Sequence, residues 1–232
     1  MHDARADEVC MPADDWLIWQ LADSAFPIGS FAHSNALEAA WQQNRVTDGR
    51  SLSSFIQASL SQTARASLPL VVAAQREPEA FERWDALCDA MLSNHVANRA
   101  SRAQGMSLLA TAEKVYGGRE LSQLRADARS DRLCAHLAPV FGFVVNVLAI
   151  DPARAARLFL FFHLRGLISS AIRLGVVGPL EGQTIQAGLS SHAEQMVCIG
   201  MAFPTGEATQ TSPMIELIAA THDRLYSRLF QS

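Results

Sequence analysis

Residues 151–175 read DPARAARLFLFFHLRGLISSAIRLG and indicate the fold class more clearly than any other stretch of the chain. Asp151 followed by Pro152 is typical of a helix start, because Asp caps free amides and proline fits the first helical position. Gly175 is typical of a helix end. The apolar residues between these limits leave little polar surface on any side. We therefore predict a central helix that runs to about Leu174 and packs on several neighbours.

A second helix follows from the spacing of apolar residues upstream of this stretch. Between Phe81 and Leu92 large apolar residues recur at intervals of three and four, which marks one face of an amphipathic helix. This face predicts burial against the rest of the protein. The opposite face is predicted to be polar and holds Glu82, Arg83, Asp85 and Asp89.

The remaining chain gives the same kind of pattern. Ser212 followed by Pro213 repeats the start pattern and predicts a last helix that continues through Leu225. Strand-like alternation is nearly absent, no internal repeat occurs, and about ten helices are expected. The sequence therefore predicts an all-α protein with one orthogonal, bundle-like domain over residues 14–232. Residues 1–13 are predicted to form a flexible arm.

Charge and targeting features limit the partners and the cellular location that we expect for this chain. The chain of 232 residues is 49% hydrophobic and 18% charged with a net charge of −4, and it has no basic block, so we do not expect it to bind nucleic acid. We expect no secretory signal, because no apolar region follows a basic start at residue 1. The most apolar runs of the chain, 137–150 and 158–168, are shorter than the roughly 20 residues that cross a bilayer. Its four cysteines lack paired spacing, as is usual for reduced thiols. We expect a cytoplasmic protein that does not contact a membrane.

The chain carries no recognisable catalytic motif. Its one lysine, Lys114, lies in a predicted helix and not in a glycine-rich phosphate loop, so nucleotide hydrolysis by such a loop is not expected. Cys134 and His136 are the nearest pair of metal-ligating types, but the spacing favours packing over ligation. His163 sits within the apolar helix and is interpreted as a core histidine. We predict no catalytic residues, no metal ligands and no cofactor.

Three segments are unusual for a helical protein. Residues 19–40 hold a helix, a Pro/Gly elbow and a second helix start, and residues 173–182 read RLGVVGPLEG. Residues 222–232 place Tyr226, Leu229 and Phe230 among arginines. Aromatic residues and arginines often anchor interfaces, so this last segment is predicted to dock on a body or a partner.

These segments resemble the UreF family of urease accessory proteins. The elbow reads FPIGSF at 26–31 and ends in Ser34, Leu37 and Glu38, and the last segment reads YSRLFQS at 226–232. Residues 98–109 and 139–148 resemble the family's central helix and its buried apolar segment. The resemblance assigns partner contacts to Phe26, Pro27, Gly29, Phe31, His33, Ser34, Leu37, Glu38, Arg173, Gly178, Pro179, Tyr226, Ser227, Arg228, Leu229 and Phe230.

The chain is more similar to the plant-like branch of that family. Many bacterial members have Tyr where this chain has His33, and Gln-Gly where it has Asn35 and Ala36. Bacterial members also read Leu-Gly-Gln in place of residues 177–179. The plant-like branch shares the Phe-Ala-His-Ser form of residues 31–34 in the elbow and the Gly-Pro-Leu form of the middle segment.

The resemblance implies a scaffold and not an enzyme. Members of the family form a homodimer, bind UreD (also called UreH), recruit the nickel-carrying GTPase UreG and dock on apo-urease. Nickel is then cargo, and GTP is bound by UreG. We accordingly expect the isolated chain neither to hydrolyse GTP nor to hold nickel tightly, and we expect it to self-associate through apolar surface near residues 159–162.

Two other functions remain open from the residues alone. A small-molecule enzyme would need polar groups that meet in a pocket, and the candidates are His33, Glu38, Arg173 and Glu181. A general helical oligomerisation module would share the apolar helices without needing the elbow or the last segment. For the scaffold, we expect removal of residues 226–232 to leave helicity and melting nearly unchanged while abolishing UreD binding, with Arg228 as a polar anchor.

Overall fold

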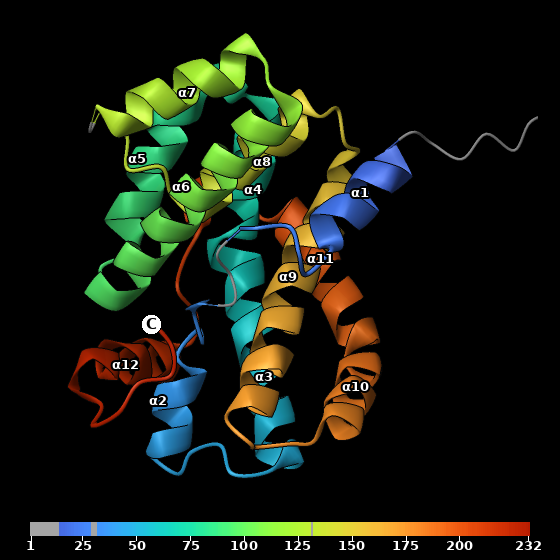
Figure 1. Cartoon of the computed structure of the whole chain (residues 1–232), viewed down its shortest axis with the longest axis vertical. Coiled ribbons are helices and arrows are strands. Elements are labelled where there is room, and N and C mark those ends of the chain that lie inside the picture. The colour runs from blue at the N-terminus through green and yellow to red at the C-terminus, as the bar shows by residue number, and fades with distance from the viewer. Residues whose placement is uncertain (1–13, 29–31, 131) are drawn as a thin grey trace, which may run out of the picture.

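The computed structural model describes residues 14–28, 32–130 and 132–232 (Figure 1). Helices make up the architecture, and no strand occurs within these ranges, which confirms the predicted all-α single domain. The predicted arm at 1–13 lies outside the described residues. The helices are α1 (Asp14–Ala22), α2 (Leu37–Gln42), α3 (Gly49–Ala66), α4 (Leu68–Arg76), α5 (Phe81–Met91), α6 (His95–Tyr116), α7 (Arg119–Arg129), α8 (Leu137–Val147), α9 (Pro152–Arg173), α10 (Pro179–Gly188), α11 (Ser190–Ala202) and α12 (Pro213–Ala220).

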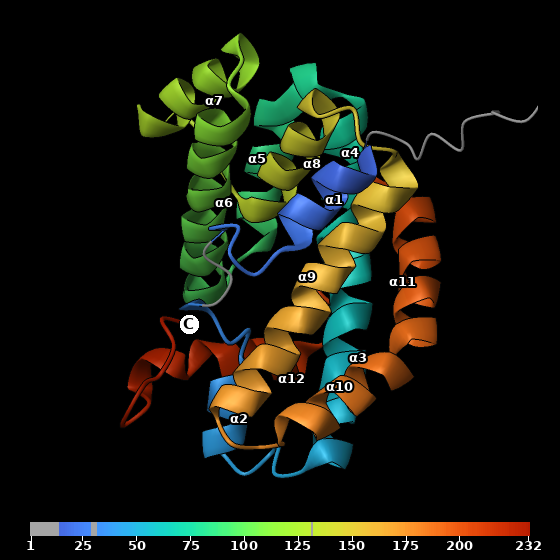
Figure 2. The same cartoon turned by 45° about the vertical axis from the view of Figure 1, so that its right-hand side comes forward.

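Helix α9 forms the centre of the fold, as its sequence predicts. The Asp151 side chain caps it by accepting the Arg154 amide at 3.0 Å, and Gly175 ends it with a φ of 73°. Figure 2 shows α9 running along α3, and α10 and α11 also pack against it. Phe159 and Phe162 are buried against Phe141 of α8. The apolar character of α9 is therefore satisfied within this chain.

Helix α9 is also the one helix, among those described, that is long and apolar enough to cross a membrane. It has 22 residues, which is more than the apolar run 158–168 suggested. In its most apolar window 61% of the residues are buried inside the structure. Core helices of folded domains commonly have this combination of length, composition and burial.

Helices α4 to α8 form a second group, drawn in the upper part of Figure 1. Helix α8 lies directly against α4, because Gly142 has no side chain; a Cβ there would collide with the backbone oxygen of Val71. Helix α5 contacts both α4 and α8. The upper group therefore packs through close backbone approach as well as through apolar side chains.

The polar face predicted for α5 is wrong at one position. Asp85 is only 2% exposed, although its spacing places it with Glu82 and Arg83. Its carboxylate accepts the backbone amides of Cys134, Ala135 and His136 at 2.7, 2.9 and 2.8 Å. A buried carboxylate is stable when several N–H donors surround it, and a loop distant in sequence supplies them here.

The last helix is shorter than predicted. Helix α12 ends at Ala220, and a 3-10 turn at His222–Arg224 replaces the helix expected to continue through Leu225. Ser212 also makes no capping hydrogen bond, because its hydroxyl donates to the Ala58 oxygen on α3. The chain then folds back over α2 (Figure 1).

Candidate partner-docking junction

The elbow lies against the upper helices. Phe26 is buried and stacks on Tyr116 of α6, with ring centroids 6.3 Å apart. The Pro27 oxygen accepts hydrogen bonds from the hydroxyls of Ser107 and Thr111, at 3.1 and 3.0 Å. These contacts fix the entrance of the elbow on α6. The predicted contact residues Gly29 and Phe31 lie outside the described residues.

Glu38, in the first turn of α2, holds the last segment of the chain in place. Its side chain is buried, and its carboxylate accepts the amides of Leu229 at 2.6 Å and Phe230 at 3.2 Å. His222 Nε2 lies 3.1 Å from the same carboxylate. Three N–H groups from residues 222–230 thus surround one buried carboxylate, which offsets its loss of water. We call residues 26–28, 32–38 and 222–232 the junction.

The residues before α2 complete this attachment. Ser34 donates its amide and its hydroxyl to the main-chain oxygen of Ser232, at 2.5 and 3.0 Å. His33 Nδ1 lies 2.5 Å from the Ser232 hydroxyl, and the Gln231 amide donates to the Ala32 oxygen at 2.7 Å. Burial, followed by the charges of His222 and Arg99, lowers the pKa of His33. The neutral imidazole therefore belongs to the closed junction.

The apolar side chains of the last segment have different environments. Phe230 is 4% exposed, and the Arg173 guanidinium lies 4.3 Å above its ring centroid. Tyr226 is fully exposed, and Leu229 is 52% exposed. The backbone beneath them is held, since the Gln42 side chain donates to the Ser227 oxygen at 2.8 Å. Deletion of residues 226–232 would remove the buried Phe230, so the structure leads us to expect a lower melting temperature, in contrast to the unchanged melting predicted from the sequence.

The structure thus separates the predicted contact residues into two groups. Those that support the surface from inside are Phe26, His33, Ser34, Leu37, Glu38 and Phe230, and all are buried in this chain. Those that are exposed are Pro27, Arg173, Gly178, Pro179, Tyr226, Ser227, Arg228 and Leu229. Gly178 and Pro179 lie at the start of α10, outside the junction. The Arg228 guanidinium lies 3.5 Å from the Asp223 carboxylate, so its charge is already partly matched.

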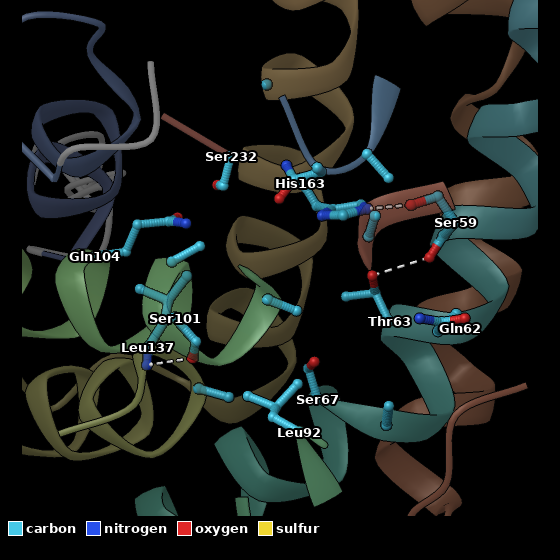
Figure 3. A pocket seen from close by; sticks show the side chains of 18 of the residues that line it. Ser59, Gln62, Thr63, Ser67, Leu92, Ser101, Gln104, Leu137, His163 and Ser232 are labelled. Carbon is cyan, nitrogen blue, oxygen red and sulfur yellow. Dashed lines mark hydrogen bonds between the residues drawn. The ribbon is translucent and has the colours of Figure 1, made fainter. Parts of the chain in front are cut away.

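A cavity of about 200 Å³ lies under the junction. Figure 3 shows His163 and Ser59 on one wall, hydrogen-bonded at 2.7 Å, with Gln104 and Ser232 across from them. Burial lowers the pKa of His163 to about 4, so the side chain is neutral at physiological pH. This agrees with its interpretation as a core histidine. The residues named for the small-molecule enzyme alternative do not meet in this cavity. His33 and Glu38 do not line it; His33 Nδ1 and the Glu38 carboxylate bond to residues 222–232 instead, and Glu181 is exposed on α10.

The comparison with protein families decides the identity. A family model described as UreF matches residues 46–190, which is more than half of the chain.

This chain belongs to the UreF family.

Plant members of the UreF family are similar to this chain along nearly all its length. "Urease accessory protein F" of Arabidopsis thaliana is 37% identical over 240 residues, covering 100% of this chain and 99% of that protein. The protein of the same name from Oryza sativa subsp. japonica is 37% identical over 219 residues, covering 93% and 84%. "Urease accessory protein UreF" of Arthrobacter sp. (strain FB24) is 29% identical over 214 residues, covering 92% and 95%. The predicted resemblance to plant members is confirmed.

The backbone of the elbow turns in a left-handed conformation just before α2. Asn35 and Ala36 both have positive φ angles, 51° and 69°, just before α2. Asn and Gly adopt this left-handed conformation more readily than other residues do. Asn35 is therefore suited to this turn, and Ala36 is buried in it.

Sequence reasoning missed two groups that complete this UreF junction. His222 and Ser232 were not among the predicted contact residues, yet both bond to the elbow. Neither has a spacing relation to Glu38 or His33, because the partners are 184 and 199 positions apart. The one available signal was that elbow and last segment resemble the same family together.

Proposed function

We propose that this chain is a non-catalytic scaffold in the maturation of urease. In this proposal it forms a homodimer in the cytoplasm, binds UreD (UreH), recruits the GTPase UreG and docks on apo-urease. GTP binds to UreG, nickel passes as cargo, and the chain has no resident catalytic cofactor. Membership of the UreF family supports the urease-accessory role, and the family resemblance supports these particular partners.

The observation that carries the proposal is an apolar surface on a fixed backbone. Tyr226 is fully exposed and Leu229 is half exposed, while Glu38 and Gln42 hold the main chain beneath them. An ordered segment loses little further entropy on binding, so more of the contact energy appears as affinity. Each such side chain gains roughly 1.5–3 kcal/mol when it is fully buried. UreD is the partner that we assign to this surface.

A scaffold of this kind regulates through coupled binding. If UreG binds the assembly differently in its GTP and GDP states, the assembly must shift the nucleotide preference of UreG by the same free energy. The chain itself then needs no phosphate loop. This is consistent with Lys114, the one lysine of the chain, which lies in the last turn of helix α6.

Co-purification tests the partner assignment. We expect Tyr226→Ser combined with Leu229→Ser to lower the yield of captured UreD at least about tenfold, because two anchors worth roughly 1.5–3 kcal/mol each are lost. The free energy of unfolding of the double variant should stay within about 0.5 kcal/mol of the wild-type value, since substitutions at exposed positions rarely cost more. Val115→Ser is a matched control, because Val115 is 49% exposed near the far end of α6.

Two outcomes would contradict the proposal. If the double variant captured as much UreD as the wild-type chain does, the junction would not be the docking surface. The scaffold function itself would be contradicted if the wild-type chain captured neither UreD nor UreG under conditions in which a plant relative captures both. Light scattering on the same samples tests the proposed homodimer, which should exceed the 25.2 kDa of one chain.

A further inference from the structure

Three potential metal ligands meet on the side of the upper helices. Asp89 lies on α5, and Cys134 and His136 lie in the loop that leads into α8. One carboxylate oxygen, the thiol sulfur and one imidazole nitrogen all lie within 4.8 Å of one another. The pair Asp89 Oδ1 and His136 Nε2 is 3.0 Å apart. The expectation that Cys134 and His136 only pack was based on spacing alone, which gave no sign of Asp89.

The loop that carries two of these groups is held from both sides. On one side the buried Asp85 carboxylate accepts the amides of residues 134, 135 and 136. On the other side α6 approaches so closely that a Cβ on Gly105 would collide with the Ala135 oxygen. Ala135 itself has a φ of 57°, a left-handed conformation that only a well-supported loop keeps. The positions of Cys134 and His136 are therefore set before any ion arrives.

Neighbouring polar groups also orient two of the ligands. Ser101 Oγ lies 3.1 Å from His136 Nδ1 and accepts the Leu137 amide at 3.2 Å. Asn98 donates its side-chain amide to Asp89 Oδ1 at 2.9 Å. Metal-binding histidines generally donate their second N–H to such a partner, which directs the other nitrogen at the ion. Ser101 Oγ can accept a hydrogen bond from Nδ1–H. In that tautomer Nε2 carries no proton and its lone pair can ligate an ion beside Asp89 Oδ1, which lies 3.0 Å away.

Charge and access suit a cation. Two carboxylates lie beside Cys134: an oxygen of Asp89 is within 4.8 Å of its sulfur, and Asp85 accepts its backbone amide at 2.7 Å. His136 is fully buried, but the Asp89 side chain is 44% exposed and Cys134 is partly exposed. An ion can therefore enter from solvent and leave again. Thiolate, imidazole and carboxylate together suit ions of borderline softness.

We propose that Asp89, Cys134 and His136 form an exchangeable site for one divalent transition-metal ion such as Ni²⁺, Co²⁺ or Zn²⁺. On binding, the hydrated ion loses water, the Cys134 thiol releases its proton to solvent, and bonds form to Sγ, to His136 Nε2 and to one Asp89 oxygen. No oxidation or reduction is involved. Solvent fills the remaining positions, as in other sites with three protein ligands. The proposal rests on this geometry alone and stands whether or not the partner assignment does.

Cobalt is the probe that reports ligand type directly. Titration of the full-length chain, freed of metal and kept reduced, with Co²⁺ should give one equivalent of an ion with a thiolate-to-cobalt absorption band, displaced by Zn²⁺. Cys134→Ser should abolish the band. His136→Gln and Asp89→Asn should each weaken binding at least about tenfold, and Ser101→Ala about tenfold through lost orientation. Cys198→Ser is the matched control, because Cys198 is a free exposed thiol elsewhere.

A second measurement needs no variant. In the wild-type chain, Ni²⁺ or Zn²⁺ should slow alkylation of Cys134 at least about tenfold, read by mass spectrometry, and leave Cys198 unchanged. Melting curves confirm that each variant is folded. A band that survives Cys134→Ser in a folded chain overturns the proposal. So does a wild-type chain that shows neither the band nor protection of Cys134.

Discussion

Glu38 and Asp85 are two buried carboxylates that have the same structural role in different parts of the molecule. Each accepts backbone amides from a segment distant in sequence: Leu229 and Phe230 for Glu38, and residues 134–136 for Asp85. The separations differ, about 190 positions for the first and about 50 for the second. Both segments gain a fixed backbone without becoming part of a helix.

The segments differ in what they present. The one held by Glu38 exposes Tyr226 and Leu229, which are apolar and suit a protein surface. The loop held by Asp85 aims Cys134 and His136 at Asp89, which suits an ion. A buried carboxylate thus supplies order, and the side chains of the captured segment decide the kind of recognition. Substitution of each carboxylate can show whether the two regions contribute equally to stability and whether they open independently of each other.

Loss of the Asp85 carboxylate should have the largest effect. Asp85→Ala leaves three amides without an acceptor, and we expect at least about 3 kcal/mol of destabilisation, since each hydrogen bond to a charged group contributes about 1.5–3 kcal/mol. Denaturant unfolding measures this loss. Glu82→Ala, an exposed acid on the same helix, is the control. If the alanine variant does not fold, Asp85→Asn should still show a smaller loss. An unchanged midpoint for both variants would contradict the role given to Asp85.

Loss of the Glu38 charge should have a smaller and more local effect. Glu38→Gln keeps one acceptor but turns an amide group toward N–H donors, which we expect to cost about 2 kcal/mol. Hydrogen exchange should accelerate at the Leu229 and Phe230 amides and stay unchanged at residues 134–136. Glu181→Gln, an exposed acid on α10, should change neither region. Equal acceleration in both regions would mean that the two segments are not independent.

Acidification should produce the smallest effect and should distinguish the regions without any substitution. His33 has a folded pKa below its usual value of 6.5, so its contribution to stability is present above pH 6.5 and is lost as the pH falls through the folded pKa. We expect amide protection at residues 229–232 to fall below pH 6.5 before protection at residues 134–136 does. Exchange rates corrected for intrinsic pH dependence measure this order. The reverse order would show that His33 does not control the junction.

The fold could largely be predicted from the sequence because its helices have local signatures. The limits of α9 follow from Asp151, Pro152 and Gly175, which act on adjacent backbone groups. The length of α12 could not be predicted, since residues 221–224 leave the helix to bring His222 to Glu38. Periodicity has no information about a partner so distant in the chain.

The candidate sites likewise include features that the sequence could predict and features that depend on contacts between distant residues. The elbow and the last segment could be found because both resemble one family, although the burial of Phe230 could not. Asp85 was misplaced because spacing assigns a polar residue to solvent unless its partners are known. The ligand cluster was missed for the same reason, since Asp89 and Cys134 come together only when α5 packs beside the loop.

The junction also has a consequence for how the chain folds. It joins His33 to Ser232 across 199 positions, so this contact closes a very long loop. Such contacts form more slowly than helices do, because closing the loop costs chain entropy before the contact stabilises it. During refolding, the hydrogen bonds from residues 222–230 to the Glu38 carboxylate should therefore form after the surrounding helices have assembled. We expect this part of the molecule to be the last to gain protection from a protease.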